Sequence, residues 1–133
     1  MTQHVATIRI HNLRLRTLIG FNPEERVKKQ DIVINAEIAY TLANGVFDDR
    51  VEDALNYKTI TKAIIELVED GQFLLLEKLV GDVLAICSRD KSVQRASVTI
   101  EKPHALRFAD SVSLTLDYSA QHAAMPRLLE KAS

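Results

Sequence analysis

An acidic side chain stands inside an apolar stretch of this sequence. Residues 73–79 read FLLLEKL, so Glu77 is the one acid among leucines, and apolar residues recur at helical spacing as far as Cys87. A carboxylate held against apolar surface must find hydrogen-bond donors or stay protonated, because an unpaired buried charge is costly. Glu77 could therefore anchor a ligand that presents two adjacent N–H donors. The alternative is an ordinary first-turn acid that faces water and is stabilised by the helix dipole.

Three other positions carry side chains that could transfer or orient protons. Lys102 ends a predicted strand, just before Pro103. Tyr57 precedes a predicted helix, and Glu24 and Glu25 lie in a polar loop. A lysine can act near neutral pH if burial or nearby cations lower its pKa. Each position also has a structural interpretation: a solvated lysine, a tyrosine at the edge of the core, and acids on a soluble surface.

Composition and charge limit the class of protein. The 133 residues are 47% hydrophobic and 26% charged, which is typical of one globular domain. The net charge of −1 gives no reason to expect a nucleic acid or membrane partner. Cys87 is the only cysteine, which excludes an internal disulfide and fits a reducing compartment. With no signal-like amino terminus, we expect a cytoplasmic protein. His11 and His104 lack the spacing of metal ligands, so no metal or cofactor is predicted.

Hydrophobic periodicity predicts six elements. A long strand over 6–19 changes the parity of its apolar residues midway, which predicts a bulge near Asn12. After a polar loop over 20–29, a second strand should pair with it in an antiparallel hairpin. A helix with apolar residues from Ile60 to Val68 should stop at Gly71, and a second helix should run from Leu75 to Arg89. Two alternating strands close the order, with apolar residues from Ala96 to Ile100 and from Val112 to Tyr118.

This order of elements predicts an α+β domain over residues 1–119. Its four-stranded antiparallel sheet should pack one face on two helices, in the order β-β-α-α-β-β. Residues 120–133 lose periodicity and are predicted to be a flexible tail, with a short helix over 127–131. The open sheet edges and the Thr/Ser-rich second face favour homo-oligomerisation, because joining several sheets into a barrel removes both.

Four short segments resemble the dihydroneopterin aldolase and epimerase family of tunnelling-fold proteins. The segments are GFNPEERVKKQ (20–30), DALNY (53–57), LLLEKL (74–79) and EKPHALRFADS (101–111). The resemblance implies barrels of four subunits, stacked in pairs as octamers, with pterin sites between neighbouring subunits. It implies that Glu77, beside Leu76, grips the pterin's amino group and N3–H, a pairing that a charge-assisted bidentate contact would orient. It also implies contacts from Leu55, Asn56 and Tyr57, with Lys102 as the catalytic lysine and Glu25 near the side-chain hydroxyls. The match of Glu25 is uncertain by one residue, because Glu24 is adjacent.

Two segments resemble the dihydroneopterin triphosphate 2'-epimerase branch most: LRLRTLIG (13–20) and HALRFADS (104–111). The implied reaction inverts C2' of the dihydropterin's side chain by retro-aldol cleavage and re-addition. Arg16 and Arg107 are the favoured candidates for holding the phosphates, against the alternative that they are ordinary surface charges. Two other functions remain open: dihydroneopterin aldolase, which releases glycolaldehyde, and a non-catalytic pterin- or purine-binding oligomer.

Overall fold

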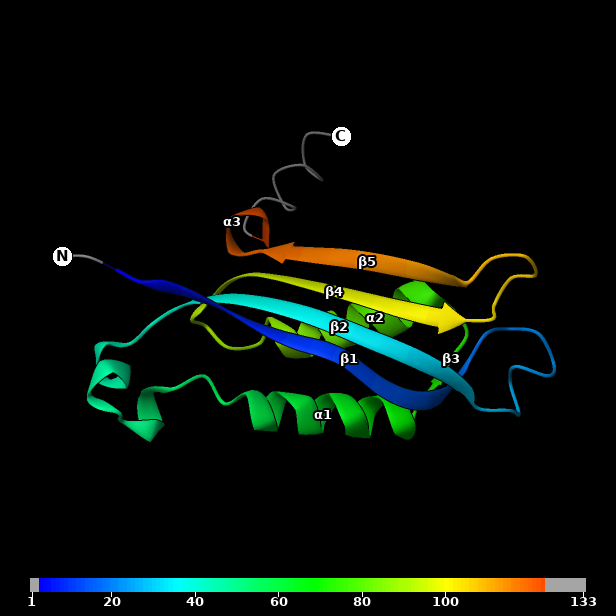
Figure 1. The fold of residues 1–133 in the computed structure, drawn as a ribbon, viewed down its shortest axis with the longest axis horizontal. Coiled ribbons are helices and arrows are strands. Elements are labelled where there is room, and N and C mark those ends of the chain that lie inside the picture. The colour runs from blue at the N-terminus through cyan, green and yellow to red at the C-terminus, as the bar shows by residue number, and fades with distance from the viewer. Residues whose placement is uncertain (1–2, 124–133) are drawn as a thin grey trace.

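Alternating apolar residues build one sheet with the strand order β3-β1-β2-β4-β5, seen in a computed structural model that describes residues 3–123 (Figure 1). Its four long strands pair antiparallel with one another and comprise β1 (Val5–Ile19), β2 (Gln30–Thr41), β4 (Val93–Pro103) and β5 (Ser111–Ser119). Their order along the chain and their antiparallel pairing confirm the predicted fold class.

The predicted bulge in β1 is confirmed. The register of the β1–β2 pair shifts between Ile10 and Leu13, and Asn12 has a φ of 50°. Asn12 donates its backbone N–H to Oδ1 of Asn35 at 2.9 Å, and the Asn35 amide donates to Oδ1 of Asn12 at 3.2 Å. Asparagine tolerates the left-handed region better than most residues, because its short polar side chain can hydrogen-bond locally. The bulge returns the apolar residues on both sides of Asn12 to the same face of the sheet.

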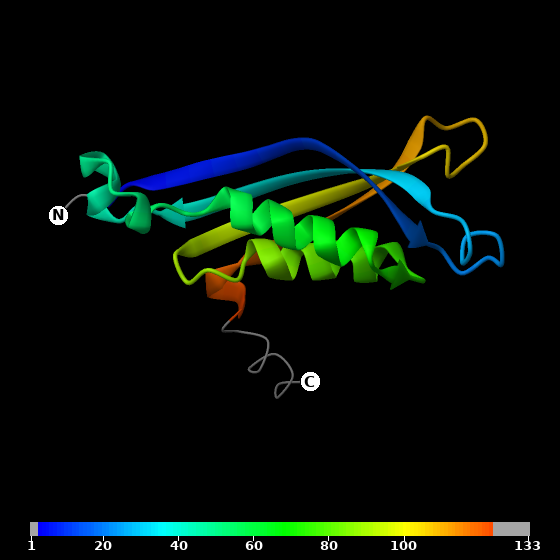
Figure 2. The same ribbon diagram turned by 90° about the horizontal axis from the view of Figure 1, so that it is seen from below.

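Two helices cover that face (Figure 2). They are α1 (Tyr57–Glu69) and α2 (Leu76–Cys87), and their apolar residues form one core with the inward residues of the sheet. Thr17 is the one buried polar side chain of the described residues, and it donates to the carbonyl of Val68 at 2.5 Å. That contact joins β1 to the last turn of α1. No helix within residues 3–123 has the length and apolar character of a membrane span.

The structure adds a fifth strand that the sequence pattern does not predict. β3 (Gln72–Phe73) pairs in parallel with Leu18 and Ile19 at the end of β1. The Gly20 N–H also donates to the carbonyl of Phe73 at 2.9 Å. Two residues are too short to show periodicity, so only backbone pairing identifies them as a strand. β3 fixes the beginning of α2 beside the end of β1.

The connections differ from the predictions at their boundaries. The crossing between β2 and α1 contains two short 3-10 helices, η1 (Asn44–Asp48) and η2 (Val51–Asp53). α2 ends at Cys87, two residues before the predicted end at Arg89, and Asp90 then accepts hydrogen bonds from Ser92 in the turn to β4. After β5, α3 covers Ala120–Ala123. The helix predicted over 127–131 lies outside the described residues.

Candidate active site

Lys102 and Glu25 form an ion pair where β4 ends. The Lys102 ammonium lies 3.3 Å from Oε2 of Glu25, and the two side chains are 14% and 24% exposed. Lys102 follows the buried Ile100 at strand spacing, so both point to the helix-covered face. Glu25 comes from the loop between β1 and β2. Of the two adjacent acids in that loop, Glu25 is the one that reaches Lys102, whereas Glu24 is exposed.

Several donors hold the Glu25 carboxylate. The Asn22 backbone N–H donates to Oε1 at 3.3 Å, and the Gln30 side chain donates to Oε2 at 3.4 Å. Burial raises the pKa of the Glu25 carboxyl, but the hydrogen bond from Lys102, the Asn22 N–H, the Lys102 charge and the Gln30 amide together lower it further. The net pKa lies below the ordinary value of 4.5, so Glu25 is ionised at neutral pH. The pair can orient a hydroxyl group and exchange a proton with it.

Leu76 and Glu77 form the first turn of α2. Leu76 is half-buried and packs against the core, and Glu77 is exposed in the single chain. Lys78 pairs with Asp82 at 2.8 Å instead of with Glu77. Leu74 and Leu75, just before the helix, are 57% and 52% exposed. Glu77 therefore lies on an open apolar surface that could be covered by a ligand or a second chain.

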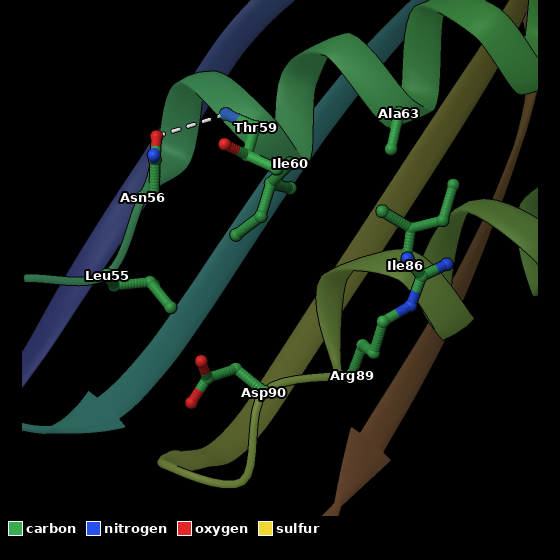
Figure 3. Close-up of a pocket in the computed structure, with 8 residues that line it drawn as sticks. All are labelled: Leu55, Asn56, Thr59, Ile60, Ala63, Ile86, Arg89 and Asp90. Atoms are coloured by element: carbon green, nitrogen blue, oxygen red, sulfur yellow. Dashed lines mark hydrogen bonds between the residues drawn. The ribbon is translucent and has the colours of Figure 1, made fainter.

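Leu55, Asn56 and Tyr57 begin α1. Oδ1 of Asn56 accepts the Thr59 N–H at 3.1 Å and caps the helix, and the first helical residue, Tyr57, is 51% exposed. Leu55 and Asn56 line a pocket of about 250 Å³ together with Thr59, Ile60, Ala63, Ile86, Arg89 and Asp90 (Figure 3). No role was predicted for Arg89 or Asp90, because neither lies in a segment that resembles the family.

These candidate residues fall at opposite ends of the molecule. The beginning of α1, with Tyr57, lies at one end of the sheet, and β3, the beginning of α2 and the loop carrying Glu25 lie at the other (Figures 1 and 2). The 13 residues of α1 alone span about 20 Å. One chain thus brings Lys102 to Glu25 and places Glu77 at the same end, but it does not bring Tyr57 to any of them.

The two candidate phosphate-binding arginines also differ in position. Arg16 lies beside the buried Thr17 in β1, so it points to the uncovered face, where its Nε lies 3.1 Å from Oδ1 of Asp31. Its guanidinium also donates to the Lys29 carbonyl at 3.0 Å. Arg107 is exposed in the loop between β4 and β5, with its Cζ 5.3 Å from the centre of the Phe108 ring. Arg107 therefore lies in the connection that begins just after Lys102, whereas Arg16 and Lys102 lie on opposite faces.

Comparison with known proteins identifies the family. The family model of FolB, dihydroneopterin aldolase, matches residues 8–117, which include every candidate residue. The chain belongs to the dihydroneopterin aldolase family. Dihydroneopterin triphosphate 2'-epimerase of Escherichia coli (strain K12) is 52% identical over 118 residues, covering 89% of this chain and 98% of the relative. The protein of the same name from Pseudomonas aeruginosa is 50% identical over 112 residues, covering 84% and 91%.

Solved structures of the dihydroneopterin aldolase family share the fold. FolB of Vibrio cholerae is 28% identical, with a TM-score of 0.79 over 86% of this chain and 97% of that chain. Escherichia coli dihydroneopterin aldolase, solved in complex with neopterin, is 24% identical, with a TM-score of 0.79 over 86% and 99%. The comparison confirms the predicted tunnelling fold for this family member.

Proposed function

We propose that this protein is a dihydroneopterin triphosphate 2'-epimerase. The observation that carries the proposal is the shielded pair of Lys102 and Glu25, which places an amine and an ionised acid together at the end of a strand. Two curated relatives with this name are 50% and 52% identical and are covered almost over their full length. The substrate would be 7,8-dihydroneopterin 3'-triphosphate, and the product its epimer at C2'.

The proposed reaction needs a base and an electron sink. A base takes the proton of the 2'-hydroxyl group, the bond between C1' and C2' breaks, and the electron pair moves into the N5=C6 imine as N5 gains a proton. The substrate thus carries its own sink, so the residues need only move protons. We assign this transfer to Lys102, through water, with Glu25 orienting the hydroxyl groups and Tyr57 assisting. Re-addition of the released aldehyde through its other face, with the reverse proton movements, inverts C2'.

Inversion requires that the aldehyde fragment stay bound after cleavage. A phosphorylated fragment carries charges that a cation can hold, whereas glycolaldehyde has none. Arg107 lies in the loop that follows β4 and Lys102, and it is the first candidate for this role. Arg16 remains the second candidate, although it already pairs with Asp31 on the opposite face of the sheet. Glu77 and Leu76 would hold the pterin ring, with Leu55 and Asn56 at its other edge.

A complete site would require two chains. Tyr57 begins α1 and Glu77 lies in the first turn of α2, and these helix starts lie at opposite ends of one subunit (Figures 1 and 2). A neighbour must therefore supply one end of each site. Large apolar side chains are exposed at both ends, including Phe47 and Val51 at one and Leu74 and Leu75 at the other. A contact between unlike ends can repeat until a ring closes. We therefore propose a ring-forming homo-oligomer, with an octamer of two stacked rings as the specific expectation.

The decisive experiment offers the purified protein two substrates separately, dihydroneopterin and its 3'-triphosphate. We expect the triphosphate to be converted to the monapterin configuration, resolved by chromatography after oxidation and dephosphorylation. Lys102→Ala should reduce turnover by at least about a hundredfold, since general acid–base groups contribute on this scale, and should leave pterin affinity largely intact. Lys91→Ala, in the exposed turn after α2, is the matched control.

Dihydroneopterin aldolase is the second candidate function. The matching family model carries that name, and dihydroneopterin aldolase of Haemophilus influenzae is 29% identical over 107 residues. Release of glycolaldehyde from the unphosphorylated substrate as the faster reaction would favour it over the epimerase. Binding of either pterin with no conversion would instead favour a binding protein and would contradict both enzymatic assignments.

A further inference from the structure

Gln30 lies between the end of β1 and the loop that carries Glu25. Its side-chain Nε2 donates to the carbonyl oxygen of Ile19 and, at 3.4 Å, to Oε2 of Glu25. A side-chain amide has two N–H donors, so each acceptor can receive one. Lys102 donates to the same carboxylate oxygen at 3.3 Å. The Glu25 oxygen nearest Lys102 is therefore also the one that Gln30 contacts.

Few other contacts fix the Glu25 carboxylate. The loop over 20–29 is held by backbone turns, such as Arg26 N–H to the Asn22 carbonyl at 3.1 Å, and at its end by Lys29, which donates to the Glu69 carbonyl at 3.1 Å. Its side chains other than Glu25 are exposed. The Asn22 N–H that reaches Glu25 belongs to the same loop, so it does not connect the carboxylate to the sheet. Among the described residues, Lys102 and Gln30 are thus the side chains that connect this carboxylate to the sheet, and Gln30 is the uncharged one.

Gly20 shows how closely the carboxylate packs. Its φ is 125°, in the region that favours glycine, and a Cβ at this position would overlap the Glu25 carboxylate. The loop therefore folds Glu25 back over the backbone at the end of β1. Gln30 bonds the neighbouring carbonyl, of Ile19, so one side chain joins both sides of this fold.

We propose that Gln30 is a positioning residue, which holds the Glu25 carboxylate against Lys102 during the reaction. This inference rests on the proposed function. The 3.4 Å contact is long for a hydrogen bond, and it should shorten when the substrate's hydroxyl groups engage Glu25. Without the amide, Glu25 would keep its attraction to Lys102 but lose its fixed direction.

The charged surroundings of Glu25 define the expected pH effect. Lys102 of β4 is the charged group that faces the carboxylate in the described structure, and Glu24 and Arg26 flank it in the chain with exposed side chains. The hydrogen bond from Gln30 favours the ionised form of Glu25. Its removal should therefore raise the pKa of Glu25, and activity that needs the carboxylate should be lost at a higher pH.

The test replaces Gln30 with methionine, which has a similar length and no N–H donor. We expect Gln30→Met to lower kcat by about tenfold, because the loss of a hydrogen bond to a charged group has an effect of about this size. KM should change little, because the pterin-binding residues are untouched. The acidic limb of the profile of kcat/KM against pH should move to higher pH. Gln94→Met is the matched control, because Gln94 donates to Thr41 and Ser92 at the other end of the sheet.

Gln30→Glu provides a second variant with a directional expectation. A second carboxylate beside Glu25 should raise its pKa more than methionine does, so the acidic limb should move further. An unchanged kcat, or a lower kcat with an unmoved acidic limb, would overturn the positioning role. A carboxyl ¹³C NMR titration of Glu25 separates this inference from the proposed function, because it needs no activity. If wild type fails to convert the triphosphate, an unchanged Glu25 pKa in Gln30→Met still refutes the role of Gln30.

Discussion

At the scale of single residues, shielding from water gives the pair of Lys102 and Glu25 its importance. Exposed ion pairs contribute little to stability, because water screens them and long side chains lose freedom. Lys102 and Glu25 are only 14% and 24% exposed, whereas Arg9 and Glu37, paired on the uncovered face, are 51% and 56% exposed. The shielded pair is therefore the one whose removal should affect both stability and chemistry.

Glu25→Gln should make stability depend less on pH. The pKa of Glu25 is lowered below 4.5 in the folded chain, so its ionised form stabilises the fold above that pH and the contribution disappears as the pH falls through the folded-state pKa. We expect the variant to lose about 1 kcal/mol at pH 7, and the difference from wild type to shrink towards pH 3. Urea denaturation at both pH values and one protein concentration measures this.

Glu24→Gln is the control for that prediction. Glu24 is adjacent and exposed, so its replacement should leave the free energy of unfolding nearly unchanged at both pH values. An equal loss from both variants, or a loss from Glu25→Gln that is as large at pH 3 as at pH 7, would contradict the assigned ion pair.

The sequence predicted a lysine and an acid for the site, but it did not show which of the two adjacent acids pairs with the lysine. Glu24 and Glu25 are consecutive in a loop without periodicity, so no pattern distinguishes them. The structure does so through the turn, in which the Glu24 carbonyl accepts the Lys28 N–H and the Glu25 side chain folds back over Gly20. The role of Gln30 was not predicted for a related reason. Gln30 lies in one of the four segments that resemble the family, but its amide contacts a loop residue, and only the structure shows the path of that loop.

At the scale of elements, the parity of apolar residues in β1 carried the most information. A change of parity within one strand requires an extra residue, because side chains alternate between faces with a period of two. The structure places that residue at Asn12, as the sequence predicted. The short strand β3 could not be predicted in this way, since its two residues are recognised by backbone pairing with β1 alone.

Asn12→Val should destabilise the protein through the backbone of the bulge. A β-branched residue is strained at a φ of 50° and cannot accept the hydrogen bond from Asn35, which together should cost about 2 kcal/mol. Asn12→Gly should cost about half as much, because glycine adopts this φ freely and loses only the side-chain bond. Urea denaturation of both variants measures which one loses more stability. Equal losses would show that backbone strain at Asn12 does not cause the destabilisation.

At the scale of the whole molecule, the candidate residues fall into two groups at opposite ends of the sheet. The end of β4, the loop before β2 and the beginning of α2, which carry Lys102, Glu25 and Glu77, lie at one end of the sheet. The beginning of α1, with Tyr57, lies at the other (Figures 1 and 2). Each sequence segment could be matched to the family, but the sequence could not show that the candidate residues lie far apart within a single chain. That separation follows from α1, which runs along the sheet for its full 13 residues before β3 returns the chain to the end of β1.

Mixed oligomers should therefore recover activity from two inactive chains. Glu77→Ala removes the proposed pterin anchor at one end, and Tyr57→Ala alters the other end. When both variants are co-expressed with different tags and purified through both, about a quarter of the contacts in randomly assembled rings should join two intact ends. The mixed sample should regain about a quarter of wild-type turnover. The matched control mixes Glu77→Ala with Lys102→Ala, whose lesions share one end, so no contact can restore a complete site. Recovery in the control would show that Glu77 and Lys102 come from different chains and would contradict their shared end. No recovery in the first mixture, despite mixed assemblies, would place the whole site within one chain.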